Sequence, residues 1–416
     1  MRKRLSIDPK LFEVNTSKSK DFQNMQKTDF HCTVPVGDFS RTDGTFTRKE
    51  VDKNKRIINL NLRDHCDEFA IDVDFLAENL MKGFDKKQHT IKPHGLGYLL
   101  NYVAYSAKKS KKQKELSLAE VTYNANFVSE SSLLAKMAMT PYSARIVPKD
   151  DAGWAALCFC VGKTIFISPE AANEQMDANK LLARAKKTFR KEMFARLCTT
   201  DAYQNGNKRN GKIDLDDGYY QVLQTSLSKG CQMEETLRVF YSSRIDCVHE
   251  NGFIGGSPIG LCTHYDSIQR GPTWTSKSFT WAVESQFSGA KSVVVAQYDT
   301  KDDRIKKVYH VPQAFVVQEM SSELDVFECT NGRNGFTDTI MREQMLNFDN
   351  RVLIVKHCPG SKTVEFDTYV SANGSGDAAR LDAMLTPKFM TRFNEEIANS
   401  SYSSSKSNSN TSLNIG

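Results

Sequence analysis

Three kinds of side chain that can act on a charged substrate occur in order along the second half of this 416-residue chain. Arg238 interrupts the apolar run 237–241, hydroxyl side chains follow at Thr275 and Ser276, and Glu343 comes later. The planar guanidinium of arginine binds phosphate oxygens in a fixed orientation. A carboxylate can stabilise the positive charge that develops on a sugar when its glycosidic bond breaks. These side chains could together hold a phosphate group and stabilise a positive charge that develops beside it.

The same stretches resemble the mono-ADP-ribosyltransferase superfamily, in particular the catalytic subunits of pertussis and cholera toxins. The segments that carry the resemblance are Val239-Phe240-Tyr241-Ser242-Ser243-Arg244, Asn251-Gly252-Phe253, Thr273-Trp274-Thr275-Ser276 and Met341-Arg342-Glu343. The resemblance implies an enzyme that uses NAD, releases nicotinamide and transfers ADP-ribose to a macromolecule, with a host-cell protein as the acceptor. Together with the free cysteines, the lack of an export signal and the Ser/Asn-rich tail, it indicates a bacterial effector that a specialised machine secretes without a signal peptide and that acts in the host cytoplasm. The alternative expectation is a cytoplasmic protein.

The resemblance assigns a role to each residue of the predicted site. Arg238 and Tyr241 would bind NAD, with Arg238 on the phosphates, while Thr275 and Ser276 would stiffen the site and orient NAD. Glu343 would be the catalytic carboxylate, acting together with Arg238. No metal is implied.

Three positions leave alternatives open within this hypothesis. Glu328 is a second candidate for the catalytic carboxylate. Met341 stands where arginine-modifying members carry another glutamate, and Trp274 replaces a serine of the family pattern. The chain could therefore be a catalytically degenerate member that binds partners, or a transferase of the same fold that modifies nucleic acid. A nucleic-acid partner would contact the lysine-rich run formed by Lys108, Lys109, Lys111, Lys112 and Lys114.

Each of these residues also has an ordinary structural interpretation. An arginine in an alternating strand is often a surface residue, and isolated glutamates are usually solvated. Thr-Ser pairs frequently cap helices. The ten cysteines include no CxxC pair, so we expect free thiols in a reducing environment rather than a zinc or disulfide framework.

The elements that would position the site follow from hydrophobic periodicity. Helices are predicted at 75–81, 95–107 and 170–197, and a short helix is predicted to end at Asn251-Gly252. Strands are predicted at the ranges 57–62, 154–161, 164–167, 237–241, 292–298, 314–318 and 351–357. Thr275 and Ser276 are expected on a strand that leads into a helix.

The predicted fold class is α+β, with an ADP-ribosyltransferase-like split β-sheet domain preceded by a mixed α/β domain. We expect a polar leader over 1–55, an N-terminal α+β domain over 56–205, a catalytic domain over 219–390 and a disordered Ser/Asn-rich tail over 399–416. The hydrophobic fraction of 39% fits a folded protein, and the net charge of +6 would ease contact with acidic partners. The sequence lacks an apolar run long enough to cross a membrane as a helix.

Overall fold

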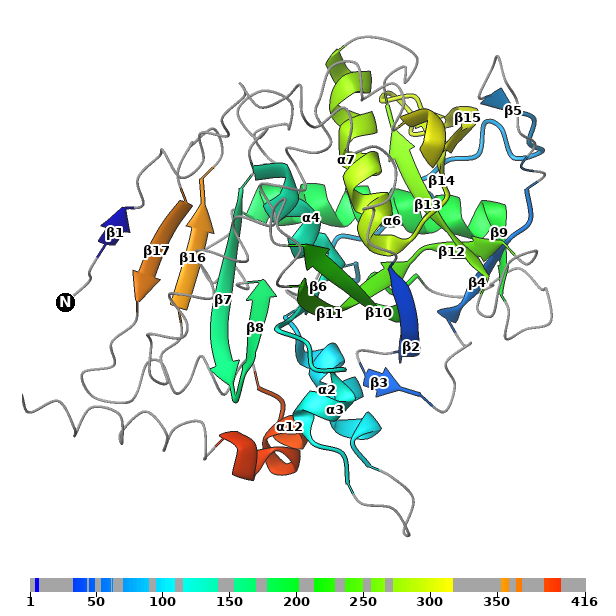
Figure 1. Ribbon diagram of the computed structural model, residues 1–416. Coiled ribbons are helices and arrows are strands. Elements are labelled where there is room, and N and C mark those ends of the chain that lie inside the picture. Colours follow the sequence, from blue (N-terminus) through cyan, green and yellow to red (C-terminus); the bar gives the residue numbers. More distant parts are fainter. Residues whose placement is uncertain are drawn as a thin grey trace, which may run out of the picture.

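The computed structural model describes most of the chain between residues 33 and 316, together with shorter segments at both ends (Figure 1). The described residues are 4–6, 33–42, 45–48, 54–60, 62, 70–89, 95–108, 115–140, 153–169, 178–201, 213–228, 236–249, 256–265, 272–316, 353–358, 364–368 and 385–397. Within these ranges, none of the helices is both long enough and apolar enough to cross a membrane.

The larger of two β-sheets has ten strands among the described residues. Their spatial order is β1 (Arg4–Ser6), β17 (Val364–Thr368), β16 (Leu353–His357), β7 (Trp154–Val161), β8 (Thr164–Pro169), β6 (Phe127–Glu130), β11 (Thr236–Ile245), β10 (Gly218–Ser228), β2 (Val34–Thr42) and β3 (Thr45–Thr47). Most neighbours are antiparallel, whereas β6 is parallel to both β8 and β11.

The smaller sheet has seven strands in the described part of the chain. Their order is β5 (Ala70–Ile71), β15 (Ile305–Pro312), β14 (Ser292–Tyr298), β13 (Ser257–His264), β12 (Cys247–His249), β4 (Arg56–Ile58) and β9 (Thr199–Asp201). Strand β11 of the larger sheet is separated from β12 of the smaller sheet by Asp246 alone, so this residue lies at the junction of the two sheets.

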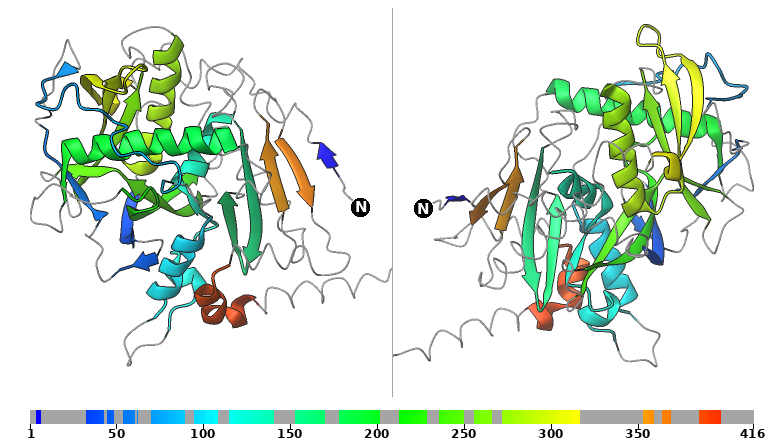
Figure 2. Two further views of the ribbon diagram at one scale, coloured as in Figure 1. Left: turned by 180° about the vertical axis from the view of Figure 1, so that it is seen from behind. Right: turned by 45° about the horizontal axis from the view of Figure 1, so that its top comes forward.

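Helices form layers on both faces of the sheets (Figures 1 and 2). Among the described residues, the helices labelled in Figure 1 are α2 (Gly97–Ser106), α3 (Leu118–Val121), α4 (Ser131–Met139), α6 (Ala178–Cys198), α7 (Pro272–Ser288) and α12 (Pro387–Arg392). Residues of α2, α3 and α12 pack on one face of the larger sheet, and those of α4 and α7 pack between the two sheets. Residues of α6 pack on the other face of the smaller sheet.

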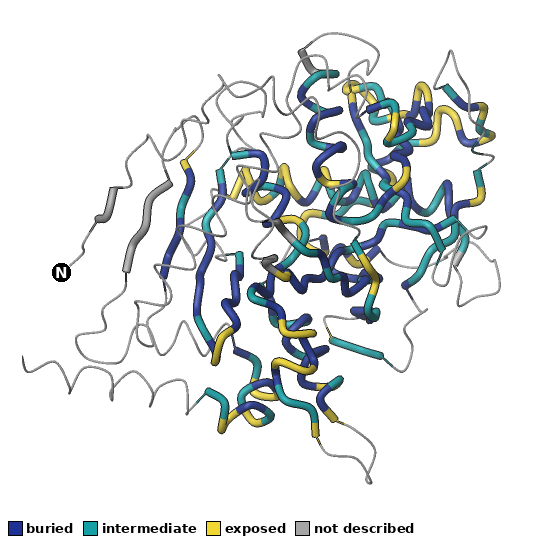
Figure 3. Tube along the Cα trace, viewed as in Figure 1, coloured by how far each residue is buried: buried dark blue, intermediate teal, exposed yellow. Residues whose placement is uncertain are grey.

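Alternation along the strands explains this layering. In β14, Val293 and Val295 face the core shared with α4 and α7, whereas Val294 and Ala296 face the core under α6. Both sides of such a strand are apolar because both sides are covered. Figure 3 shows the result as buried residues running along the central strands.

Most of the predicted elements that fall on described residues are present, including the hairpin of β7 and β8 around Gly162-Lys163. Helices α2 and α6 also form, the latter from residue 178. The α+β class is confirmed. Strands from before residue 205 and after residue 219 pair with each other in both sheets, as β6 does with β11 and β4 with β12.

The helix predicted at 75–81 is wrong. This segment forms turns instead, because its N–H groups pair with the β14–β15 hairpin: Ala77 N donates to Ile305 O and Leu80 N to Asp303 O, both at 2.9 Å. Ala77 takes a φ of 70°, which no α-helix contains. Tertiary pairing has overridden the local apolar pattern.

Three further element predictions are wrong. The residues before Asn251 form β12 rather than a helix, and residues 313–316 are helical where a strand was predicted. Thr275 and Ser276 lie inside α7 rather than on a strand before it. The part of the predicted polar leader that the structure describes forms strands β1, β2 and β3, and Phe39 of β2 is buried. The Ser/Asn-rich tail at 399–416 and the lysines at 109–114 lie outside the described residues.

Candidate functional site

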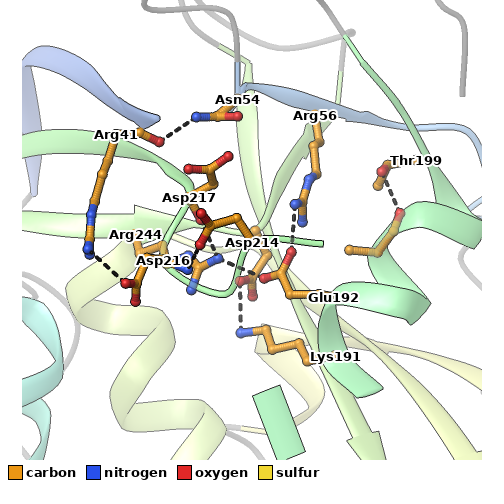
Figure 4. Close-up of polar contacts among 12 residues, drawn as sticks. Arg41, Asn54, Arg56, Lys191, Glu192, Thr199, Asp214, Asp216, Asp217 and Arg244 are labelled. Carbon is orange, nitrogen blue, oxygen red and sulfur yellow. Dashed lines mark hydrogen bonds and ion pairs between the residues drawn. The ribbon is translucent and has the colours of Figure 1, made fainter. Parts of the chain in front are cut away.

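A buried glutamate on α6 is the centre of the most highly charged cluster that the structure describes (Figure 4). Glu192 is only 4% exposed, although it lies on a helix whose other buried residues are mostly apolar. It follows Phe189 by three residues, so both side chains point toward the same side of the helix. A carboxylate in such a position must be paired, because burying an unpaired charge is very costly.

Two arginines provide that pairing, one from each sheet. Arg56 of β4 places Nη2 2.6 Å from Oε2 of Glu192, and Arg244 of β11 places Nη2 2.7 Å from Oε1. Burial by itself raises the pKa of Glu192, but the two guanidinium groups outweigh burial and lower the pKa to about 2. Burial opposes the charge of Arg244, yet Glu192 raises the pKa of that arginine above its ordinary value. All three groups are therefore charged at neutral pH.

The depressed pKa of Glu192 predicts an acid-sensitive fold. Its usual pKa of 4.5 falls to about 2 in the folded protein, which corresponds to roughly 3 kcal/mol of stability. This contribution is complete above about pH 5 and is lost as the pH falls through 4.5 toward 2. We expect the free energy of unfolding, measured with urea, to be lower at pH 3 than at pH 6. In the Glu192→Gln variant this difference between the two pH values should be smaller. An equal pH dependence in that variant would contradict the assignment.

Asp246 forms the second charged centre, at the junction of the sheets. Its Oδ1 is 2.8 Å from Nζ of Lys191, and its Oδ2 accepts a 2.9 Å hydrogen bond from the backbone N–H of Leu261 on β13. Burial lowers the pKa of Lys191, but Asp246 outweighs this effect and holds the pKa above its ordinary value. Adjacent residues of α6 thus carry a cation for Asp246 and an anion for the two arginines.

A fourth ion pair, with Arg41, extends the cluster along β2. Arg41 is 1% exposed, lies 3.3 Å from Asp216 and stacks over the ring of Tyr98 at 4.2 Å. The loop that holds Asp216 also receives Arg244, whose Nη2 donates to the carbonyl oxygen of Asp217 at 2.7 Å. Figure 4 shows the arginines approaching these acidic residues from different strands.

Gly218 gives Arg244 room to reach Glu192. A Cβ at this position would lie 2.9 Å from Nε of Arg244, which is closer than packing permits. We therefore expect Gly218→Ala to displace Arg244 and to lower stability by about 1–3 kcal/mol. Thermal unfolding of this variant, compared with Gly162→Ala in the β7–β8 turn, tests the contact. Because Gly162 has a φ of 61° and nothing near its Cβ position, the comparison separates crowding from backbone strain.

Solvent reaches the cluster on the side of Lys191 and Arg244. Their side chains keep 38% and 31% exposure, whereas Arg56 keeps 12%. Lys187 of α6 and Lys277 of α7 lie near enough to Lys191 that all three favour the charged forms of Cys262 and Glu284. Desolvation dominates at both groups and raises the pKa of each. Cys262 is thus a poor candidate for a reactive thiolate.

Each oxygen of the two central carboxylates, Glu192 and Asp246, already contacts a donor. Both oxygens of Glu192 contact arginines, and the two oxygens of Asp246 contact Lys191 and a backbone N–H. Within the described ranges, no group of three or more His, Cys, Asp or Glu side chains is placed to hold a metal ion. The centre offers positive charge rather than a set of oxygen ligands.

The structure places the residues of the sequence-predicted site apart from this cluster. Arg238 is exposed, and its backbone and guanidinium contact Asn126 and Tyr123. Tyr241 is fully buried in the core, where its ring meets Phe287 edge-on. Thr275 and Ser276 lie on α7, as described above. Glu328, Met341 and Glu343 lie outside the described residues.

Sequence reasoning missed the cluster, although two signals were present. One is Glu192, a charged residue on the apolar face of the strongest predicted helix. The other is Arg244-Ile245-Asp246, where two charged residues flank a buried isoleucine at the end of a strand. Neither signal indicates which oppositely charged residue is the partner, because the residues that form the ion pairs lie far apart in the sequence.

A family model described as RAI1 like PD-(D/E)XK nuclease matches residues 35–376. Rai1 of Scheffersomyces stipitis, in complex with (3'-NADP)+ and calcium ion, superposes with a TM-score of 0.65 at 13% identity, over 95% of this chain and 98% of that one. Candida albicans Rai1 in complex with pU5-Mn2+ gives 0.63 at 12% identity, over 95% and 100%. S. pombe Rai1 in complex with 3'-FADP gives 0.59 at 10% identity, over 89% and 100%. No curated protein sequence matches significantly.

These similarities correct the sequence-based function. An ADP-ribosyltransferase fold is wrong, since the matched fold is that of Rai1 over nearly the whole chain. Four further predictions are wrong for the same reason, because that resemblance alone implied them. They are the NAD-cleaving activity, NAD as cofactor, the host-protein acceptor and the toxin-like role. The family model spans residues 35–376 of the 416 in the chain. The chain therefore belongs to the RAI1-like PD-(D/E)XK nuclease family.

Proposed function

We propose that the protein binds single-stranded nucleic acid carrying a 5′-phosphate, at the charged cluster around Glu192 and Asp246. The observation that carries the proposal is the accessibility of two cations there. Lys191 and Arg244 each pair with a carboxylate of the cluster and still keep contact with solvent. Phosphate groups dominate the affinity of proteins for nucleic acids, and they are held by such side chains.

The family supports this choice of ligand. Its members are described as nucleases, and the solved relatives are named with pU5, 3'-FADP or (3'-NADP)+. All of these ligands carry phosphate groups on a nucleotide. Lys187 and Lys277 extend the positive charge from the cluster onto α6 and α7, which gives a longer strand further phosphate contacts.

Divalent metal, which two of these relatives are named with, does not fit this donor set. Hard cations such as Ca²⁺ and Mn²⁺ need carboxylate or carbonyl oxygens that face the ion. Here the four carboxylate oxygens of Glu192 and Asp246 are held by two arginines, a lysine and a backbone N–H. We therefore derive no metal-dependent step for this chain.

Binding can be measured by fluorescence anisotropy with 5′-phosphorylated pentauridine. Lys187→Ala and Lys277→Ala should each weaken binding by about 3–10-fold and reduce the salt slope by about 0.7, since each loses roughly one phosphate contact. Lys163→Ala serves as the matched control, because Lys163 is an exposed lysine in the β7–β8 turn. Equal losses in all three variants, or no binding by the wild-type protein, would refute the proposal.

A further inference from the structure

The family is named for an acidic residue, any residue and then lysine, and the described strands of this chain contain no such triplet. In the described residues the pattern occurs at Asp85-Lys86-Lys87 and Asp299-Thr300-Lys301, both of which lie in turns. Beside Asp246, strand β13 carries Gly260-Leu261-Cys262. The strand that contacts Asp246 therefore offers neither a second carboxylate nor a lysine there.

Side chains from other elements occupy this space. Lys191 approaches Asp246 from helix α6, and Arg244 approaches Glu192 from β11 on the side away from Arg56. Each carboxylate is thereby neutralised by the protein itself. A divalent ion placed among them would meet three fixed cations at short range, and their mutual repulsion is strong where burial reduces screening.

We propose that this cluster is a metal-free anion site, in which Lys191 and Arg244 receive a phosphate group directly and no divalent ion is bound. The proposal rests on the proposed function for the identity of its ligand class. An ammonium carries three N–H donors and a guanidinium five. Asp246 takes one donor of Lys191, and Glu192 and the Asp217 carbonyl are reached by one nitrogen of Arg244. Both side chains remain accessible to solvent, so a phosphate can approach them.

The anion also suits the electrostatics of the cluster. Lys191 and Arg244 keep contact with solvent, and Lys187 of α6 and Lys277 of α7 add positive charge near Lys191. A phosphate would satisfy this charge with charge-assisted hydrogen bonds, which are about twice as strong as neutral ones. The cluster would thus bind a nucleotide phosphate without a divalent metal ion.

The first test uses the metal alone, so it is independent of nucleic acid. Isothermal titration of the full-length protein with MnCl₂ is expected to show no binding at concentrations up to about 1 mM, because no oxygen set is available. Binding in the micromolar range would overturn the proposal, whatever the affinity for RNA.

The second test uses uridine 5′-monophosphate in EDTA, observed by ligand NMR. The wild-type protein should bind it, Lys191→Gln should weaken binding about tenfold, and Lys191→Arg should restore most of the affinity. Lys180→Gln, an exposed lysine on the same helix, should have no effect. Failure to bind the monophosphate, or equal losses in both glutamine variants, would overturn the anion site. If the monophosphate binds but pentauridine does not bind more tightly, the anion site stands and the proposed function fails.

Discussion

Replacing Glu192 with alanine is expected to lower the free energy of unfolding by about 3–5 kcal/mol, the usual cost of removing one partner from a buried ion pair. The change leaves Arg56 and Arg244 facing each other without the carboxylate that neutralises both. It also removes the contact through which α6 joins strands of the two sheets. Urea unfolding, followed by circular dichroism at neutral pH, measures the loss.

The control for this prediction is Glu395→Ala, which truncates an exposed glutamate near the end of the chain and should change stability by less than about 0.5 kcal/mol. A loss below about 1 kcal/mol for Glu192→Ala would mean that the arginines find other partners. The ion-pair cluster would then not hold the two sheets together.

Reversing the charge of the two outer lysines is the change with the largest expected effect on binding. Lys187→Glu combined with Lys277→Glu should weaken 5′-phosphorylated pentauridine by about 100-fold or more at 50 mM salt, because two attractive contacts become repulsive. Both residues lie at the helix surface rather than in the core, so folding should persist. Anisotropy titration measures the affinity, and circular dichroism verifies the fold.

The salt dependence distinguishes a phosphate contact from a general effect of net charge. The same reversal at Lys163 together with Lys301, both in hairpin turns, changes the net charge equally and should weaken binding by less than about threefold. A similar loss in both double variants would show that binding is spread over the surface. The cluster would then have no special role.

The local hydrophobic pattern predicted many of the helices and strands, but it failed where contacts distant in the sequence determine the backbone. The β7–β8 hairpin, β14 and α6 form where apolar alternation or helical spacing indicates them, because their neighbours cover the faces that the pattern marks as apolar. The segment at 75–81 shows a helical pattern, yet its backbone pairs with Ile305 and Asp303 instead. Hydrophobic periodicity is read over a short stretch of sequence, so it cannot predict contacts between segments more than 200 residues apart.

The candidate site could not be predicted from local sequence for a related reason. Arg238 drew attention as a charge within an apolar strand, but it lies at the exposed end of β11. Arg244, six residues later on the same strand, is the arginine that meets buried acid. The difference depends on the contact between Arg244 of β11 and Glu192 of α6, and no motif in either segment encodes that contact.

We propose that this member of the family binds nucleic acid without a metal ion, and one pair of titrations tests this most directly. The measurement titrates 5′-phosphorylated pentauridine once in EDTA and once in Mn²⁺. We predict affinities within about twofold of each other, a difference below about 0.5 kcal/mol. Binding that requires Mn²⁺ would contradict the proposal.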